Sequence, residues 1–128
     1  MNAKDVDFFE KVKAQIRQLH GEVSVLSKSK PDNPINKFKL GFINEKPEEA
    51  NAILKGDFKP FKDFTTFKTD DLPSNSDVVM VLSQYLDCLE AWRSAHVEHV
   101  RGTGNIWRID GEETIHTDPP SRFRRSSK

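Results

Sequence analysis

Hydrophobic residues recur at alternating spacings of three and four along the first part of the chain. The positions that follow this pattern are Phe9, Val12, Ile16, Leu19, Val23 and Leu26. Such spacing places side chains on one stripe of an α-helix. The pattern therefore predicts an amphipathic helix over about residues 4–27.

A second helical pattern begins at Asn33-Pro34. This pair suits a helix start, because asparagine caps free amides and proline lacks an amide proton that would have no partner there. The pattern predicts a helix over about residues 34–55, with its seam at Ile35, Phe38, Phe42, Ile43, Ala50, Ile53 and Leu54. Pro47 interrupts it by removing a backbone hydrogen bond. Two forms stay open: one kinked helix, or two short helices broken near Lys46.

The third helical pattern is the strongest periodic signal in the chain. It starts at Ser74-Asn75-Ser76-Asp77, which matches a capping box, and it predicts a helix over about residues 75–100. Its seam consists of Val78, Leu82, Tyr85, Leu89, Trp92, His96 and His99.

After Gly104 the pattern changes from helical to alternating. Asp110-Gly111 lies between two alternating runs, which predicts a β-hairpin over about residues 105–117. A two-stranded hairpin is unstable alone, so we expect Trp107 or Ile109 to pack on the helices. The expected fold is mainly α: an antiparallel three-helix bundle with a C-terminal β-hairpin, in one domain over residues 1–120, followed by a basic flexible tail at 121–128.

Composition narrows the classes of function. The chain has 128 residues, and 20 Lys and Arg residues balance 20 Asp and Glu residues, so the strong positive field typical of nucleic-acid binders is missing. Cys88 is the only cysteine, which excludes an intramolecular disulfide and a cysteine-rich zinc module. No run approaches the roughly 20 apolar residues of a membrane span. These features predict a cytoplasmic protein that does not bind membranes.

A segment rich in aromatic residues follows the second predicted helix. Its rings stand at a strict spacing of three residues, at Phe58, Phe61, Phe64 and Phe67. The favoured interpretation is a loop whose rings cover one end of the bundle, and the alternative is an exposed patch that binds a protein partner. Trp107 and Arg108 are further candidates for partner binding, because both residue types are common at interface hot spots.

Two other groups suggest different functions. The tail holds the one local basic run, and its candidates for weak, salt-sensitive nucleic-acid binding are Arg122, Arg124, Arg125 and Lys128. His96 and His99 lie three residues apart on the predicted helix and are weak candidates for metal binding.

No group of residues supports catalysis. Cys88 is close to Asp87 and Glu90, which disfavour a reactive thiolate, and the paired carboxylates of the chain fit helix starts and loops. We therefore expect a non-enzymatic protein–protein interaction module, such as an adaptor, inhibitor or regulatory subunit, that uses no cofactor. Self-association into a homodimer is an open form of this hypothesis. Nucleic-acid binding through the tail and metal binding through the histidines are the alternatives.

Overall fold

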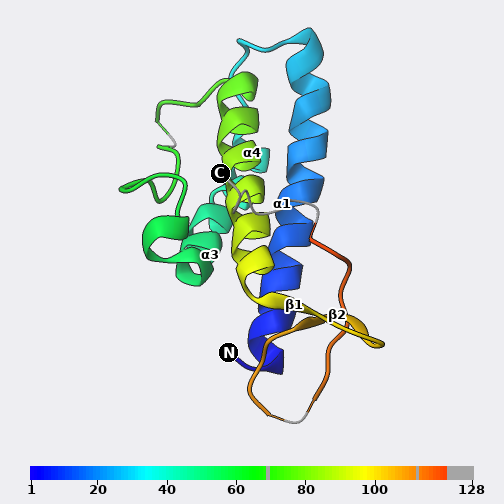
Figure 1. Ribbon diagram of the computed structural model, residues 1–128. Coiled ribbons are helices and arrows are strands. Elements are labelled where there is room, and N and C mark those ends of the chain that lie inside the picture. The colour runs from blue at the N-terminus through cyan, green and yellow to red at the C-terminus, as the bar shows by residue number, and fades with distance from the viewer. Residues whose placement is uncertain (69, 112, 121–128) are drawn as a thin grey trace.

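Two long helices form the frame of the molecule (Figure 1). The structure is a computed structural model that describes residues 1–68, 70–111 and 113–120. Helices α1 (Ala3–Ser29) and α4 (Asn75–Ala95) run antiparallel and side by side. Two shorter helices, α2 (Lys37–Ile43) and α3 (Glu45–Leu54), complete the bundle, and α3 contacts both long helices. The predicted mainly α architecture with an antiparallel hairpin is confirmed.

Both long helices begin with a reciprocal cap. The side chain of Ser74 accepts a hydrogen bond from the amide of Asp77, and the Asp77 carboxylate accepts one from the amide of Ser74, so the predicted capping box is present. Asn2 and Asp5 form the same arrangement at the start of α1. Each cap satisfies two amides that the helix itself leaves unpaired.

The second helical segment differs from its prediction in two ways. It begins at Lys37 rather than at residue 34, because Asn36 is the cap that accepts hydrogen bonds from the next turn. Pro34 instead forms an isolated β-bridge with Ser74. The segment is also broken at Asn44 into α2 and α3, which is the two-helix alternative. Pro47 therefore lies in the first turn of α3, where its missing amide proton removes no helical hydrogen bond.

The third helix ends earlier than its prediction, and the hairpin begins earlier. Helix α4 ends at Ala95, and strand β1 (Val97–Val100) pairs with β2 (Gly104–Trp107) in antiparallel register. The turn between them uses Gly102 and Gly104, whose φ angles are 82° and 101°, values that favour glycine.

The predicted pairing around Asp110-Gly111 is reduced to an isolated bridge between Ile106 and His116. Two backbone hydrogen bonds flank this bridge, from the amide of Trp107 to the carbonyl of Ile115 and from the amide of Thr117 to the carbonyl of Asn105, each 3.0 Å long. The hairpin and the segment after it lie across the lower end of α1 and α4 (Figure 1).

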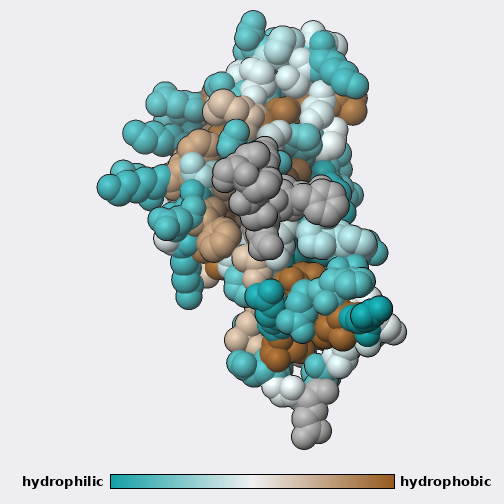
Figure 2. All heavy atoms as spheres, in the orientation of Figure 1, coloured by the Kyte–Doolittle hydropathy of each residue, from teal (hydrophilic) through white to brown (hydrophobic). Residues whose placement is uncertain are grey.

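The core lies between the long helices and closes at the hairpin. The ring of Phe9 stacks on Trp92 with centroids 5.0 Å apart and meets Trp107 edge-on at 5.2 Å. Trp107 is only 2% exposed, so the expected packing of the hairpin on the helices is confirmed. On the face shown in Figure 2, hydrophobic residues gather over β1 and β2 between hydrophilic ones. Within the described part of the chain, no helix is both long and apolar enough to cross a bilayer.

Candidate protein-binding surface

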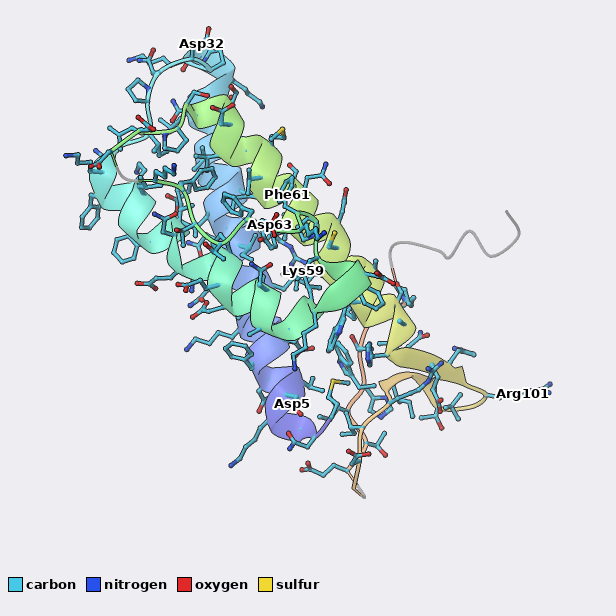
Figure 3. The ribbon with its side chains drawn as sticks, turned by 90° about the vertical axis from the view of Figure 1, so that its left-hand side faces the viewer. Asp5, Asp32, Lys59, Phe61, Asp63 and Arg101 are labelled. Atoms are coloured by element: carbon cyan, nitrogen blue, oxygen red, sulfur yellow. The ribbon has the colours of Figure 1, made fainter. Side chains whose placement is uncertain are left out.

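The four phenylalanines of the segment after α3 lie against the bundle. Phe58, Phe61, Phe64 and Phe67 are all partly buried and pack on the core. The ring of Phe61 meets Tyr85 of α4 with centroids 6.2 Å apart, and Phe64 meets Phe67 at 5.1 Å. Figure 3 shows Phe61 on the loop, with Asp63 and Lys59 close to it. The rings cover the bundle, as in the favoured interpretation, but they contact Tyr85 in the middle of α4 rather than one end of the bundle.

Hydrogen bonds from two asparagines hold this loop in place. Asn44 donates to the carbonyl of Phe67 over 3.0 Å and accepts from its amide over 2.8 Å. Asn51 donates to the carbonyl of Phe64 over 2.9 Å and accepts from the Tyr85 hydroxyl, also over 2.9 Å. Burial raises the pKa of Tyr85 from 10.0 to about 12, so the phenol keeps its proton and the hydrogen bond persists.

The two candidates for partner binding on the hairpin, Trp107 and Arg108, differ in exposure. Trp107 belongs to the core, so a partner cannot contact it without rearrangement of the fold. Arg108 is exposed, and its guanidinium donates to Glu98 over 3.2 Å and to the carbonyl of Ala95 over 3.1 Å. Arg101 lies at the outer tip of the turn, away from the bundle (Figure 3).

The two histidine candidates do not share a helix face. His96 follows the last residue of α4, where its Nδ1 lies 2.7 Å from the carbonyl oxygen of Trp92 and its ring stacks on the indole at 4.1 Å. His99 belongs to β1. The prediction that His96 and His99 lie on one helix face is wrong, because the helix ends before His99. Among the described residues, no group of three or more His, Cys, Asp or Glu side chains is placed to hold a metal ion. The tail candidates Arg122, Arg124, Arg125 and Lys128 lie outside the described residues.

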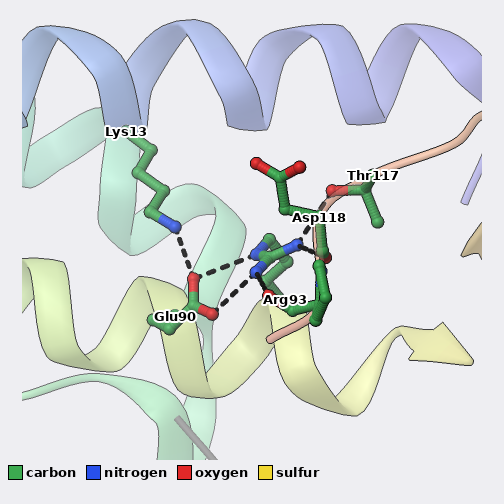
Figure 4. Close-up of polar contacts among 6 residues, drawn as sticks. Lys13, Glu90, Arg93, Thr117 and Asp118 are labelled. Atoms are coloured by element: carbon green, nitrogen blue, oxygen red, sulfur yellow. Dashed lines mark hydrogen bonds and ion pairs between the residues drawn. The ribbon is translucent and has the colours of Figure 1, made fainter. Parts of the chain in front are cut away.

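A buried ionic network joins α1, α4 and the segment after the hairpin (Figure 4). Glu90 is paired with Lys13 and with Arg93, whose Nε and Nη2 atoms donate to its carboxylate over 2.9 and 2.8 Å. Arg93 also donates to the Thr117 hydroxyl over 2.8 Å and to the carbonyl of Asp118 over 3.0 Å. Two cations, Lys13 and Arg93, share the carboxylate of Glu90, and the bonds of Arg93 to Thr117, Asp118 and Pro119 fasten residues 117–119 to the bundle. We assign it a structural role.

Among the residues that the structure describes, the largest exposed aromatic group is one that the sequence pattern places in the helical seam. Phe38 is 75% exposed and Phe42 is 49% exposed, and their rings meet edge-on with centroids 5.0 Å apart. Leu40 and Ile43 occupy the opposite face of α2 and are buried. We call Phe38 and Phe42 the α2 aromatic surface. A spacing of four residues on a helix of seven signals one shared face, but not whether that face is buried.

A groove lies beside this surface, between α1 and the α2–α3 junction. Its volume is about 240 Å³, and it is lined by Gln15, Gln18, Leu19, Glu22, Phe42, Glu45 and Lys46. Lys46 is buried and donates to Gln15 over 2.5 Å and to Glu49 over 2.9 Å, so its charge is neutralised inside the protein. Glu22 and Glu45 are exposed and have no hydrogen-bonding or ion-pair partner for their carboxylates among the described residues. We call this feature the acidic groove.

The other exposed hydrophobic side chains differ from this pair. Val25, Met80, Phe8 and Leu26 are 67%, 53%, 42% and 36% exposed, and none of them stacks on another exposed ring in the described structure. Scattered apolar side chains are normal on protein surfaces, whereas grouped rings beside a groove indicate binding.

Comparisons with known proteins add no candidate. The chain matches no protein-family model, and no significant similarity is found to a curated protein or to a solved structure. The α2 aromatic surface and the acidic groove are therefore the basis on which a function is argued.

Proposed function

We propose that this protein is a small non-enzymatic interaction module that binds a protein partner through the α2 aromatic surface and the acidic groove. The observation that carries the proposal is the exposure of Phe38, 75%, stacked edge-on against Phe42. Full burial of a phenylalanine side chain contributes about 1.5–3 kcal/mol, and this gain is available to a partner that covers the two rings. Large aromatic side chains of this kind often anchor interfaces.

The side chains that line the groove favour a partner of a particular chemistry. Leu19 and Phe42 supply apolar surface, and the exposed carboxylates of Glu22 and Glu45 supply negative charge. A complementary segment carries an aromatic or aliphatic side chain next to lysine or arginine. The same carboxylates repel phosphate groups, so this surface suits a basic peptide segment better than a nucleic acid.

Site-specific photo-crosslinking tests the proposal. A photoreactive phenylalanine analogue replaces Phe38 in one variant and Met80 of α4 in a matched control, since Met80 is also well exposed, at 53%. Both variants are expressed in cells that naturally contain the protein and are irradiated. We expect covalent adducts with a protein from position 38 and none from position 80.

The adduct from position 38 should also disappear when Phe42→Ser is added, because the second ring forms part of the same surface. A folded position-38 variant that yields no more adduct than the position-80 variant would rule out the proposed function.

A further inference from the structure

We infer that the partner of this surface is a second copy of the same chain, in a two-fold symmetric dimer in which Lys37-Phe38-Lys39 of each copy occupies the acidic groove of the other. This inference rests on the proposed function, since it uses the same surface and names the partner. It is argued from charge, exposure and symmetry.

The chain itself carries a segment with the chemistry that the groove requires. Phe38 is the most exposed of the large hydrophobic residues in the described structure, and a lysine precedes and follows it. The ammonium groups of Lys37 and Lys39 have no ion-pair partner among the described residues. Two cations beside an aromatic ring thus match two carboxylates, Glu22 and Glu45, beside the apolar side chains of the groove.

The segment cannot enter the groove of its own copy. Phe38 lies one helical turn, about 6 Å, from Phe42, which itself forms part of the groove wall. The two rings already contact each other within the copy, edge-on at 5.0 Å. A Lys37–Lys39 segment that lies across Phe42 and over Leu19 must therefore come from another molecule.

Two-fold symmetry satisfies both contacts at once. An axis that passes beside α2 between Phe38 and Phe42 sets the α2 helices of two copies antiparallel, so that Phe38 of each copy faces Phe42 of the other. The lysines of each copy then face the glutamates of the other copy, so the same ionic contact forms twice in the dimer. Such an isologous contact is closed, because each copy uses its segment and its groove together and leaves neither open for further assembly. The formal net charge of zero means that the two copies do not repel each other as whole molecules.

Charge reversal in two separate variants provides the test. The segment variant carries Lys37→Glu and Lys39→Glu, and the groove variant carries Glu22→Lys and Glu45→Lys. Sedimentation velocity measures the dimer dissociation constant of each. We expect the wild-type protein to dimerise and each variant alone to bind itself at least about 100-fold more weakly, because like charges then face each other at both contacts.

Mixing the two variants should restore the dimer to within about 10-fold of wild type. In the mixed dimer, one contact joins the new glutamates to the new lysines, and the other joins the unaltered segment to the unaltered groove. A matched control carries Lys62→Glu and Lys68→Glu, two exposed lysines on the loop after α3, and should dimerise like wild type. Circular dichroism checks that every variant keeps its helices. An unfolded segment variant is replaced by Lys37→Gln with Lys39→Gln, and an unfolded groove variant by Glu22→Gln with Glu45→Gln; each should dimerise more weakly than wild type, because one partner of each ion pair is lost.

Each other outcome overturns the inference. A monomeric wild-type protein whose position 38 still crosslinks to a different protein would refute self-association and leave the proposed function standing. A monomeric protein without any crosslink from position 38 would refute both self-association and the proposed function. Variants that dimerise as tightly as wild type, or a mixture that does not recover, would show that copies do not meet at this groove.

Discussion

Two groups of phenylalanines that are close in sequence differ in burial. The α2 aromatic surface belongs to a regular helix, yet its rings are exposed. The rings at Phe58, Phe61, Phe64 and Phe67 belong to a segment that is mostly irregular, yet they are partly buried on the core. Regular secondary structure is therefore no guide to which rings are buried in this protein.

Hydrogen-bonding partners explain the difference. The irregular loop has no regular pattern of backbone hydrogen bonds. The side chains of Asn44 and Asn51 hydrogen-bond to its backbone instead, and they hold its rings against Tyr85. The backbone groups of helix α2 hydrogen-bond within the helix, so its outer face is not held against the rest of the protein. With Leu40 and Ile43 committed to the core, Phe38 and Phe42 must lie on the other side of a helix only seven residues long.

Removal of rings from the loop is expected to have the largest effect. The double variant Phe61→Ser and Phe64→Ser should lower the free energy of unfolding by about 4 kcal/mol, because each partly buried ring loses contacts with Tyr85 and its neighbour. Urea denaturation followed by circular dichroism measures the change. A loss below about 1 kcal/mol would mean that the loop rings are not part of the core and that the contrast with α2 is false.

Alkaline pH should weaken the same region by a smaller amount. The pKa of Tyr85 rises from 10.0 to about 12 because the phenol is buried, so the folded chain holds its proton more tightly than the unfolded chain. The resulting stabilisation is complete below a pH of about 10 and is lost as the pH rises towards about 12, a total of roughly 2–3 kcal/mol.

Urea denaturation at several alkaline pH values measures this loss, and Tyr85→Phe is the control that should lack it. Tyr85 is the only tyrosine, so its phenolate absorbance reports this pKa alone. A midpoint near the ordinary value of 10.0 would show that water reaches the ring and that the loop is open.

Local signals made the long helices predictable. The alternating three–four seam of the first helix and the capping box at Ser74 act within a few residues, and both appear in the structure as expected. The end of the third helix was not predictable in this way, since Val97, His99 and Val100 continue the helical pattern. Pairing with β2, which lies beyond the Gly102 turn, draws these residues into a strand. This contact is tertiary, and it overrides the local periodicity.

The candidate surface was missed for a related reason. A single seam from Ile35 to Leu54 places Phe38 and Phe42 in line with Ala50 and Leu54, which are buried, and the sequence does not decide between one kinked helix and two short ones. The break at Asn44 separates the two halves, so each presents its own face to the core. Asn44 is fixed at this break by its hydrogen bonds to Phe67, more than twenty residues away, and no short window of sequence contains that information.

The smallest effect on stability is expected at the α2 aromatic surface, and it is also the most informative. Phe38→Ser with Phe42→Ser should lower the free energy of unfolding by no more than about 1.5 kcal/mol, because Phe38 is mostly exposed and Phe42 is about half exposed. Urea denaturation at a protein concentration low enough to dissociate any dimer measures this value, since association would add to the apparent stability. The same variant should lose dimerisation in sedimentation velocity. A large loss of stability in the isolated monomer would place these rings in the core instead, and their exposure could then no longer be read as a sign of binding.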